Sequence, residues 1–537
     1  MGLLGKIFGK GNSEKILAEA AKEYKLKNFS KACNLYSDYL KNNSDNLPAL
    51  YGRALSSFYN ETYENAKADF IKIQKTDSKF SENCNLFLSK IEYSLNNLET
   101  AVTYLDEFIS KNDKNHEAFL LRGKIFFQKK NYFRSAEDLD KTITLKPDNC
   151  EAFILLGQIK FEEGDLKKAL LFYDKGVEAE PACSTAYNYR GYTNYKLKSY
   201  DEGERDLKRA IEIHPTYTDA FYNLAVIYDE KNESEKAFEQ LKKLLAIDEK
   251  YLDAYLLRSS INSKINNYSE AIIDIDKVIE FVPCDFNYYL RRAALKKQAG
   301  DITSSKNDLL KTIKLNRNSS EAYYQLGLLS FENKYYSKAA KAFSKAIEIN
   351  PRYGEAYLQN GIACIALNKM NDADKSLTKA IEINSDSYKA YYFRAVAKEK
   401  RADHQGALTD YTRALNDSNY FDAYIGRAKL RIKTEDFNSA SIDLSKAYKI
   451  NPTNSRVFFL RGNVFKGMNK NDEALEEFNK AVEINPDYTN AYCLRGFIYF
   501  NMKKFKNAVN DWQRAINLNK NFEMRLKPFI ESASAKI

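Results

Sequence analysis

Helix-breaking residues are scarce in this sequence. The 537 residues include only 20 glycines and 9 prolines, and tryptophan occurs once. No apolar run approaches the roughly 18 residues that a membrane-spanning helix requires. Because apolar residues make up 44% and charged residues 29% of the chain, the composition predicts an ordered protein dominated by helix, without a transmembrane segment.

Histidine and cysteine are too few or too scattered for familiar catalytic and metal sites. The three histidines lack Cys or carboxylate neighbours at metal-ligand spacing, and the seven cysteines form no C-x-x-C pair. An odd number of dispersed cysteines is typical of free thiols in a reducing compartment. Glycine-rich phosphate loops are also absent, and the first ten residues lack the features of a secretory signal. We therefore expect a cytoplasmic protein that is not an enzyme and has no cofactor and no metal.

The charge balance is only mildly basic. The chain has 83 basic and 73 acidic residues, which gives a net charge of +10, and both signs are mixed along it. This pattern is typical of a solvated helical surface. A nucleic-acid or anionic-surface binder is the alternative hypothesis, and its affinity would fall steeply with salt.

An internal repeat organises the sequence. Residues 151–157 (EAFILLG), 321–327 (EAYYQLG) and 355–361 (EAYLQNG) are alike, and an alanine follows each glycine twelve residues later. The period is 34 residues, and only the repeats that start at 47 and 388 depart from it, with 35 and 33 residues. Extending this frame predicts fifteen repeats over residues 13–522, starting at residues 13, 47, 82, 116, 150, 184, 218, 252, 286, 320, 354, 388, 421, 455 and 489.

Three positions of the repeat explain its structure. Positions 8 and 20 hold Gly, Ala or Ser throughout, and position 32 holds Pro in seven repeats. Apolar residues recur at helical spacing around each small residue, which predicts two helices joined by a short polar turn. We expect the two helices to approach most closely at positions 8 and 20, and the proline to end the second helix. One such hairpin cannot bury its apolar face alone, so the copies must stack into an elongated solenoid.

The pattern resembles the tetratricopeptide repeat. In the repeat that starts at residue 320, the residues that carry the resemblance are Tyr323, Gly327, Ala339, Phe343, Ala346 and Pro351. The resemblance covers residues 13–522 and implies an all-α fold, a right-handed α-α superhelix of antiparallel helix pairs. It also implies that the first helices line a concave groove that grips peptides or partner proteins. Because a fold does not fix a function, the partner stays unidentified.

The groove predicted from the resemblance is rich in aromatic residues. Positions 2, 5, 9 and 12 of the first helices would face it, and rings at these positions offer contact area at low entropic cost. The alternative interpretation is that the rings pack between neighbouring first helices. The candidate groove residues are Tyr192, Tyr195, Tyr222, Tyr324, Phe331, Tyr392, Phe459, Phe497 and Phe500.

Nine repeats carry arginine at position 7, where the family more often has leucine. We interpret these arginines as mainly structural rather than ligand-binding, with the aliphatic stem packed and the head group reaching solvent or an acidic neighbour. They are Arg53, Arg122, Arg190, Arg258, Arg292, Arg394, Arg427, Arg461 and Arg495.

Partner classes can be ranked from the sequence. The basic clamp by which some members of the family hold chaperone carboxylates is disfavoured, because no repeat combines Lys at position 5 with Asn at position 9. We interpret the basic residues within 291–297 and 427–433 as a solvated surface, so no nucleic-acid partner is expected. Peptides or proteins are the leading partners, and self-association is a further hypothesis.

The ends of the chain differ from the repeats. Residues 1–12 carry Leu3, Leu4, Ile7 and Phe8, and we favour a capping segment there over an amphipathic membrane contact. Residues 523–537 carry Leu526, Phe529 and Ile530, which predicts a capping helix over the last repeat.

Overall fold

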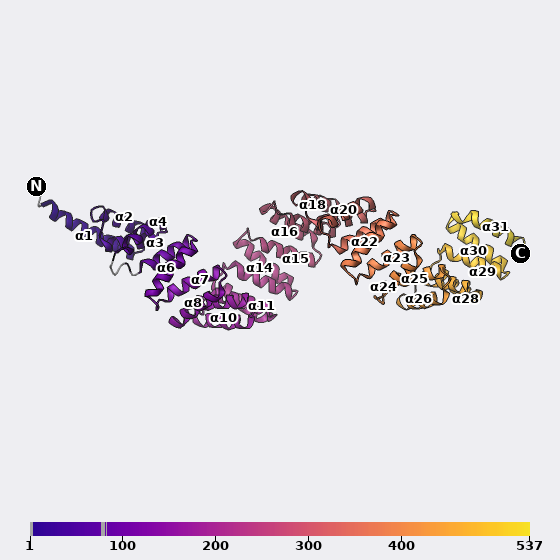
Figure 1. Cartoon of the computed structure of the whole chain (residues 1–537), viewed down its shortest axis with the longest axis horizontal. Coiled ribbons are helices and arrows are strands. Elements are labelled where there is room, and N and C mark those ends of the chain that lie inside the picture. The colour runs from indigo at the N-terminus through magenta and orange to yellow at the C-terminus, as the bar shows by residue number, and fades with distance from the viewer. Residues whose placement is uncertain (1–3, 77–80, 82) are drawn as a thin grey trace. The chain divides into compact units, whose positions relative to one another are not determined.

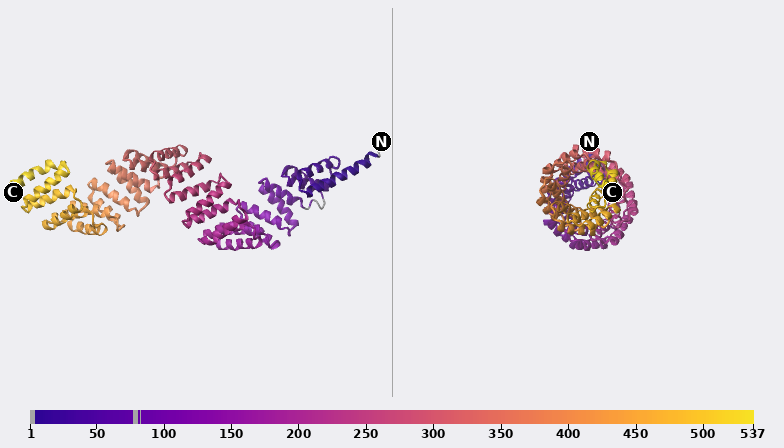
Figure 2. Two further views of the ribbon diagram at one scale, coloured as in Figure 1. Left: turned by 180° about the vertical axis from the view of Figure 1, so that it is seen from behind. Right: turned by 90° about the vertical axis from the view of Figure 1, so that its right-hand side faces the viewer.

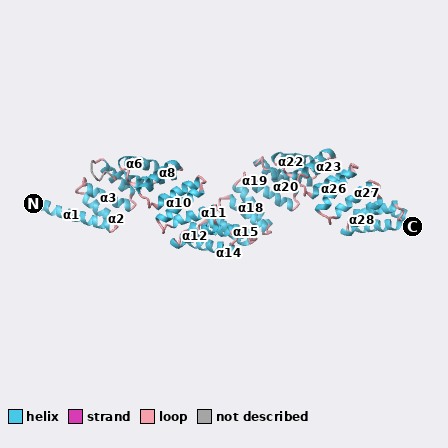
Figure 3. Cartoon of the chain, turned by 90° about the horizontal axis from the view of Figure 1, so that it is seen from below, coloured by secondary structure: helices cyan, strands magenta, loops and turns pink. Residues whose placement is uncertain are grey.

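The structure is all-α, as predicted. The computed structural model describes residues 4–76, 81 and 83–537, with side chains from Ser13 onward, and contains 31 α-helices, one short 3-10 helix and no strand within those residues. Figure 3 shows these helices joined by short loops. The chain divides into two compact units, an N-terminal unit that ends at Ile265 and a C-terminal unit that begins at Asn266. Each is described by itself.

The described residues of the N-terminal unit form fifteen helices, several of which are labelled in Figure 1. They are α1 (Leu4–Lys25), α2 (Phe29–Leu40), α3 (Leu47–Tyr59), α4 (Tyr63–Gln74), α5 (Cys84–Ser94), α6 (Leu98–Lys111), α7 (His116–Gln128), α8 (Tyr132–Leu145), α9 (Cys150–Glu162), α10 (Leu166–Ala179), α11 (Ser184–Lys196), α12 (Tyr200–Ile213), α13 (Thr218–Glu230), α14 (Ser234–Ile247) and α15 (Leu252–Lys264).

The C-terminal unit contains the other helices. They are α16 (Tyr268–Phe281), α17 (Phe286–Gln298), α18 (Ile302–Leu315), α19 (Ser320–Glu332), α20 (Tyr336–Ile349), α21 (Gly354–Ala366), α22 (Met370–Ile383), α23 (Tyr388–Lys400), α24 (His404–Ala414), α25 (Phe421–Lys433), α26 (Phe437–Ile450), α27 (Ser455–Gly467), α28 (Asn471–Ile484), α29 (Thr489–Asn501), α30 (Phe505–Leu518), η1 (Lys520–Phe522) and α31 (Glu523–Ser534).

Within each unit the helices stack in chain order. Each helix contacts its successor, and several first helices also contact the first helix of the next repeat, as α9 does with α11 and α21 with α23. Figure 2 shows the same succession from behind. The stacking buries a series of small apolar clusters, each shared by adjacent helices, rather than one central core.

The first helix begins earlier than the predicted start of the first repeat at residue 13. Helix α1 begins at Leu4 and runs without a break to Lys25, so residues 4–12 continue the first helix of the first repeat. Leu3 and the predicted repeat start at residue 82 lie outside the described residues, and α5 begins at Cys84. That residues 1–12 cap the first repeat, rather than contact a membrane, stays a prediction.

A left-handed residue makes the turn inside every repeat. Position 15 has a positive φ in all fifteen repeats, from 57° at Lys130 to 85° at Gly300. Only Gly164 and Gly300 are glycines, and the others are mostly Asn or Lys. Since an L-residue pays to adopt this conformation, the packing of the two helices must impose it.

The small residues lie where the paired helices meet. The Ser135 hydroxyl at position 20 donates to the Gly123 carbonyl at position 8, with an O–O distance of 2.7 Å. A Cβ added at Gly361 would lie 2.5 Å from Cγ of Leu377, the large residue at position 24. Position 8 is therefore small because the position-24 side chain of the second helix lies directly over it.

The C-terminal helix α31 packs against α30. Leu526 and Ala533 are fully buried, and the Phe529 ring lies 5.9 Å from Trp512 and 5.0 Å from Phe497. Helix α31 thus covers apolar side chains of the last repeat.

Candidate functional site

The nine candidate groove residues all belong to first helices, and all are half-buried. Helices α11 and α13 carry Tyr192, Tyr195 and Tyr222 in the N-terminal unit. In the C-terminal unit the rings lie on α19, α23, α27 and α29. Each side chain is therefore fixed by packing on one side and keeps part of its surface accessible.

Rings at position 5 rest on the second helix and on the residue that precedes the next repeat. Tyr324 lies 5.8 Å from Phe343 at position 24 and 4.9 Å from Tyr353 at position 34. Phe459 has the equivalent neighbours, at 5.9 Å from Phe478 and 4.8 Å from Tyr488. Tyr392 repeats the arrangement. Packing thus holds these rings in fixed orientations.

Rings at position 12 lie against the first residue of the second helix. The centroid distances are 5.2 Å for Phe331 and Tyr336 and 5.5 Å for Phe500 and Phe505. Contact between rings of neighbouring first helices, the alternative interpretation, occurs for Phe161 and Tyr192 at 5.6 Å. Most ring contacts instead lie within a repeat or at its end.

A hollow of about 260 Å³ opens between α17 and α19. Its apolar floor includes Leu290, Leu309 and Leu329, and Lys297 and Glu321 stand among its polar lining residues. Leu290, Ala294 and Lys297 occupy positions 5, 9 and 12 of α17, where other repeats carry rings. The hollow was not predicted from the sequence. The available signal was the replacement of rings by smaller or unbranched side chains at these three positions.

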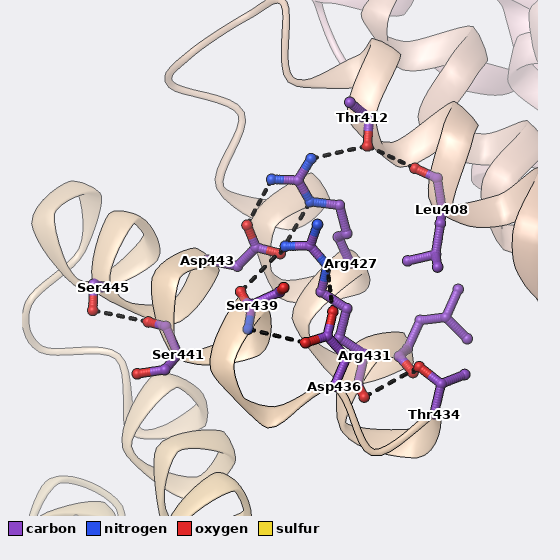
Figure 4. Close-up of polar contacts among 11 residues, drawn as sticks. Leu408, Thr412, Arg427, Arg431, Thr434, Asp436, Ser439, Ser441, Asp443 and Ser445 are labelled. Atoms are coloured by element: carbon purple, nitrogen blue, oxygen red, sulfur yellow. Dashed lines mark hydrogen bonds and ion pairs between the residues drawn. The ribbon is translucent and has the colours of Figure 1, made fainter.

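The position-7 arginines form a repeated ion pair. In at least eight repeats the guanidinium meets an acidic side chain sixteen residues later, at position 23 of the repeat, on its second helix. Seven of these partners are aspartates held through two N–O contacts, as in Arg427 and Asp443 at 3.0 and 2.6 Å (Figure 4). The pairs are Arg53–Asp69, Arg122–Asp138, Arg190–Asp206, Arg292–Asp308, Arg394–Asp410, Arg427–Asp443, Arg461–Glu477 and Arg495–Asp511.

The same arginines also connect successive repeats. Arg190 Nη1 donates to Asp174, at position 25 of the preceding repeat, at 2.8 Å. Arg427 Nη1 donates to the hydroxyl of Thr412, which occupies position 25 of its preceding repeat, at 2.9 Å (Figure 4). A ring at position 4 completes the surroundings, since the Arg190 guanidinium carbon lies 5.3 Å from the Tyr187 centroid. The structural interpretation of these arginines is therefore confirmed.

The sequence contained a signal for this pairing. All nine repeats with Arg at position 7 have Asp or Glu at position 23, and none of the other six repeats does. The pairing becomes visible only when positions 7 and 23 are compared together. In the repeat that starts at 354, Asn360 and Ser376 take the two places and hydrogen bond at 3.2 Å.

Most described members of the two basic groups are ion-paired. Lys296 and Arg292 share Asp308, and Lys297 pairs with Glu332 at 2.8 Å. Arg431 Nη1 lies 2.7 Å from Asp443 beside Arg427. Their charges are thus largely neutralised by neighbouring carboxylates rather than by solvent alone.

Two cysteines that look unrelated in the sequence lie together. The Sγ atoms of Cys150 and Cys183 and a carboxylate oxygen of Glu180 are all within 4.8 Å of one another. The hydrogen bond from the Cys150 thiol lowers the pKa of Cys183, burial opposes this, and the backbone N–H groups of Ala186 and Thr185 lower it further. The sequence did not suggest this group because the two cysteines are the first and last residues of one repeat rather than a C-x-x-C pair.

The chain is a helical-repeat protein, and family models identify the repeat. Models described as tetratricopeptide repeat match residues 88–149, 154–218, 207–239, 320–353, 354–387 and 489–522, and one described as TPR repeat matches residues 462–503. The chain belongs to the tetratricopeptide repeat family. In general terms, this membership supports a protein-interaction scaffold, which is typically non-catalytic.

Two curated proteins match a short stretch of the chain. Sperm-associated antigen 1 of Homo sapiens and of Mus musculus are each 33% identical over 75 residues, which is 14% of this chain and 8% of those proteins. The match thus spans less than a tenth of either relative.

Solved structures with a similar fold include the APC/C hetero-tetramer Cut9-Hcn1 and yeast Tom70. The first has a TM-score of 0.37 and 14% identity over 97% of this chain and 96% of its own. The second has a TM-score of 0.32 and 19% identity over 79% and 100%. Likenesses at this level carry no functional argument.

Among the described helices, none is both long and apolar enough to cross a membrane.

Proposed function

We propose that this protein is a non-enzymatic scaffold whose first-helix surfaces bind extended peptides or partner proteins. The observation that carries the proposal is the recurrence of oriented, half-buried Tyr and Phe side chains on α11, α13, α19, α23, α27 and α29. Aromatic side chains already held by packing lose little entropy on binding, so each can act as a preorganised anchor.

The hollow between α17 and α19 supports the same surface. It offers an apolar floor of leucines beneath polar side chains, which suits one buried apolar side chain of a peptide and hydrogen bonds to its backbone. Its polar lining includes Glu321, and Lys297 there is already paired with Glu332, which disfavours a uniformly anionic polymer.

Ion pairing speaks against the nucleic-acid alternative. A phosphate backbone is bound through counterion release at many unneutralised Lys and Arg side chains. Here Arg292, Lys296, Lys297 and Arg431 already contact carboxylates. The net charge of +10 is thus not concentrated at these places.

The test is partner capture from a native lysate by the full chain, eluted in salt steps after nuclease treatment. Tyr195→Glu and Phe331→Glu place a charge on the proposed surface, and Ala294→Tyr fills the hollow with a ring of the kind that Tyr192 provides at position 9. Phe133→Glu is the matched control, because Phe133 lies on second helix α8 and is 74% exposed.

We expect proteins that resist salt and nuclease to be captured by the native chain and by Phe133→Glu, and to be lost from at least one first-helix variant whose circular dichroism is unchanged. Unaltered capture by all three variants would place the binding site elsewhere. Material removed by nuclease would favour the alternative, and self-association would appear as a concentration-dependent mass in light scattering.

A further inference from the structure

Three potential metal ligands meet at the junction of two successive repeats. Cys150 is the first residue of α9, Glu180 follows the last residue of α10, and Cys183 precedes the first residue of α11. Their Sγ and carboxylate oxygen atoms all lie within 4.8 Å of one another. The three side chains therefore come from the first residue of α9 and from the turn between α10 and α11.

The backbone fixes this arrangement. The Cys183 N–H donates to the Glu180 carbonyl at 2.9 Å, so one tight turn carries two of the three ligands. Cys150 is 6% exposed and belongs with Ala186 of α11 to one apolar cluster. The site thus has a buried thiol on one side and an exposed carboxylate on the other.

The donor set suits one class of ion. Zinc prefers thiolates with imidazole or carboxylate in tetrahedral geometry, and Zn–S bonds of about 2.3 Å place two sulfurs about 3.8 Å apart. The separations here, all below 4.8 Å, exceed that sulfur–sulfur distance by at most about 1 Å. Soft thiolate ligands also select against Mg²⁺ and Ca²⁺.

We propose that Cys150, Glu180 and Cys183 bind a borderline divalent transition-metal ion of the Zn²⁺ type and that the ion joins two successive repeats. Binding releases the thiol protons to solvent and leaves the ion with two thiolates and one carboxylate. The fourth coordination position faces the exposed side, where water or an external ligand completes the tetrahedron.

The ligand set is specific to one repeat. Positions 1, 31 and 34 hold these three residues, whereas the preceding repeat has His116, Lys146 and Asn149 there and the following one has Ser184, His214 and Tyr217. Position 31 is Asn in eight of the fifteen repeats, so Glu180 departs from the common residue. The site is therefore a feature of this junction and not of the repeat as such.

The test uses the reduced full-length chain and Co²⁺ as a spectroscopic probe for Zn²⁺. We expect one equivalent of Co²⁺ to give sulfur-to-cobalt charge-transfer bands and tetrahedral d–d bands, and Zn²⁺ to remove them. Competition with a chromophoric chelator then measures the Zn²⁺ affinity. Zn²⁺ should also slow amide hydrogen exchange around residues 150 and 180–184, a readout that a loosely bound surface ion would not move.

Variants can be taken from other repeats so that folding is preserved. Cys150→Ser introduces the residue found at Ser184, Cys183→Asn the helix cap found at Asn149, and Glu180→Asn the residue found at Asn350. We expect each cysteine variant to weaken Zn²⁺ binding at least ~100-fold and Glu180→Asn about tenfold. Cys284→Ser, at an exposed cysteine far along the chain, should leave binding unchanged.

Several outcomes would overturn the proposal. Absence of sulfur-to-cobalt bands in the native chain is one, and equal binding by Cys150→Ser is another. A loss of two mass units caused by a Cys150–Cys183 disulfide that persists under mild reductant would assign the pair to redox chemistry instead. Should a cysteine variant misfold, Glu180→Asn decides the question, because it keeps both thiols.

Discussion

At the scale of single residues, the position-7 arginines are the most consequential side chains of the array. Seven of them pair with an aspartate of the second helix and Arg461 pairs with Glu477, and several also contact the preceding repeat. Arg495 and Asp511 are a suitable example, with side chains 14% and 9% exposed. Burial raises the pKa of Asp511, and the hydrogen bond from Arg495 opposes that rise. The stability of the pair therefore depends on both partners being present.

We predict that Arg495→Leu destabilises the last repeat by about 3–5 kcal/mol, because it leaves a buried carboxylate without its cation. Arg495→Leu combined with Asp511→Leu should recover most of that loss, since other repeats already use leucine at position 7, as at Leu156. Hydrogen exchange in α29 and α30 is the measurement. Equal destabilisation by the single and double variants would contradict this account.

Glu204 should make the stability of the contact between α12 and α13 depend on pH. Burial raises its pKa, but hydrogen bonds from Lys208, Lys231 and Tyr228 outweigh this and lower the pKa from 4.5 to about 2. The folded-state pKa lies below the unfolded one, so this contribution to stability is complete above about pH 4.5 and is lost as the pH falls toward 2. Glu204 belongs to α12, whereas Tyr228 belongs to α13 and Lys231 follows it, so the loss falls on the contact between two repeats.

We expect Glu204→Gln to remove the acid-dependent part of hydrogen-exchange protection in α12 and α13 between pH 4.5 and 2, after correction for intrinsic exchange. Glu239→Gln is the control, because Glu239 makes only an exposed pair with Lys243 within one helix. An identical pH profile for native chain and Glu204→Gln would show that the Glu204 contacts do not persist in solution.

At the scale of the element, the hairpin turn stores local strain. Position 15 is left-handed in every repeat whatever residue stands there, with φ values of 82° at Gly164 and 63° at Ala402. A Cβ added at Gly164 would meet nothing within 4 Å, so backbone conformation alone decides the effect of a substitution there.

We predict that Gly164→Ala destabilises its hairpin by about 1 kcal/mol and that Ala402→Gly stabilises its own by a similar or smaller amount. Hydrogen exchange in α9–α10 and α23–α24 measures the two effects. If both substitutions shifted stability in the same direction, the left-handed turn would not be the cause.

Sequence reasoning could find the hairpins but not every feature that shapes them. Gly157 and Ala169 recur in phase with their counterparts, so helix number and pairing were readable from small residues and prolines. The left-handed turn was not, because Lys130, Asn232 and Ala402 have no common side-chain chemistry. Which face of a ring such as Tyr324 stays accessible depends on contacts with residues 343 and 353, whose directions no spacing reveals. The binding role of the nine candidate rings stays a prediction.

At the scale of the whole molecule, stability is a sum over neighbours. Within each compact unit, a repeat buries apolar side chains against the next, and the contacts join helices that are adjacent or next but one in the chain. Such arrays need not unfold as one cooperative unit, because a terminal repeat can open while others stay folded. The chain carries a convenient reporter, since its single tryptophan, Trp512, lies in the last repeat and is fully buried.

We predict that urea unfolding of the native chain has a lower midpoint when it is followed by tryptophan emission than when it is followed by far-ultraviolet circular dichroism. The Trp512 indole is held by Phe497 at 5.1 Å, by Phe529 of α31 at 5.9 Å and by an N–H bond to the Cys493 carbonyl at 3.2 Å. A chain truncated after residue 522 loses Phe529 and Leu526, so its emission should shift to the red and its fluorescence midpoint should fall further. The main circular dichroism transition should barely move, because the other repeats keep their neighbours. Coincident transitions in both chains would instead show that the terminal repeats are coupled to the rest of the array over distances that nearest-neighbour stacking does not explain.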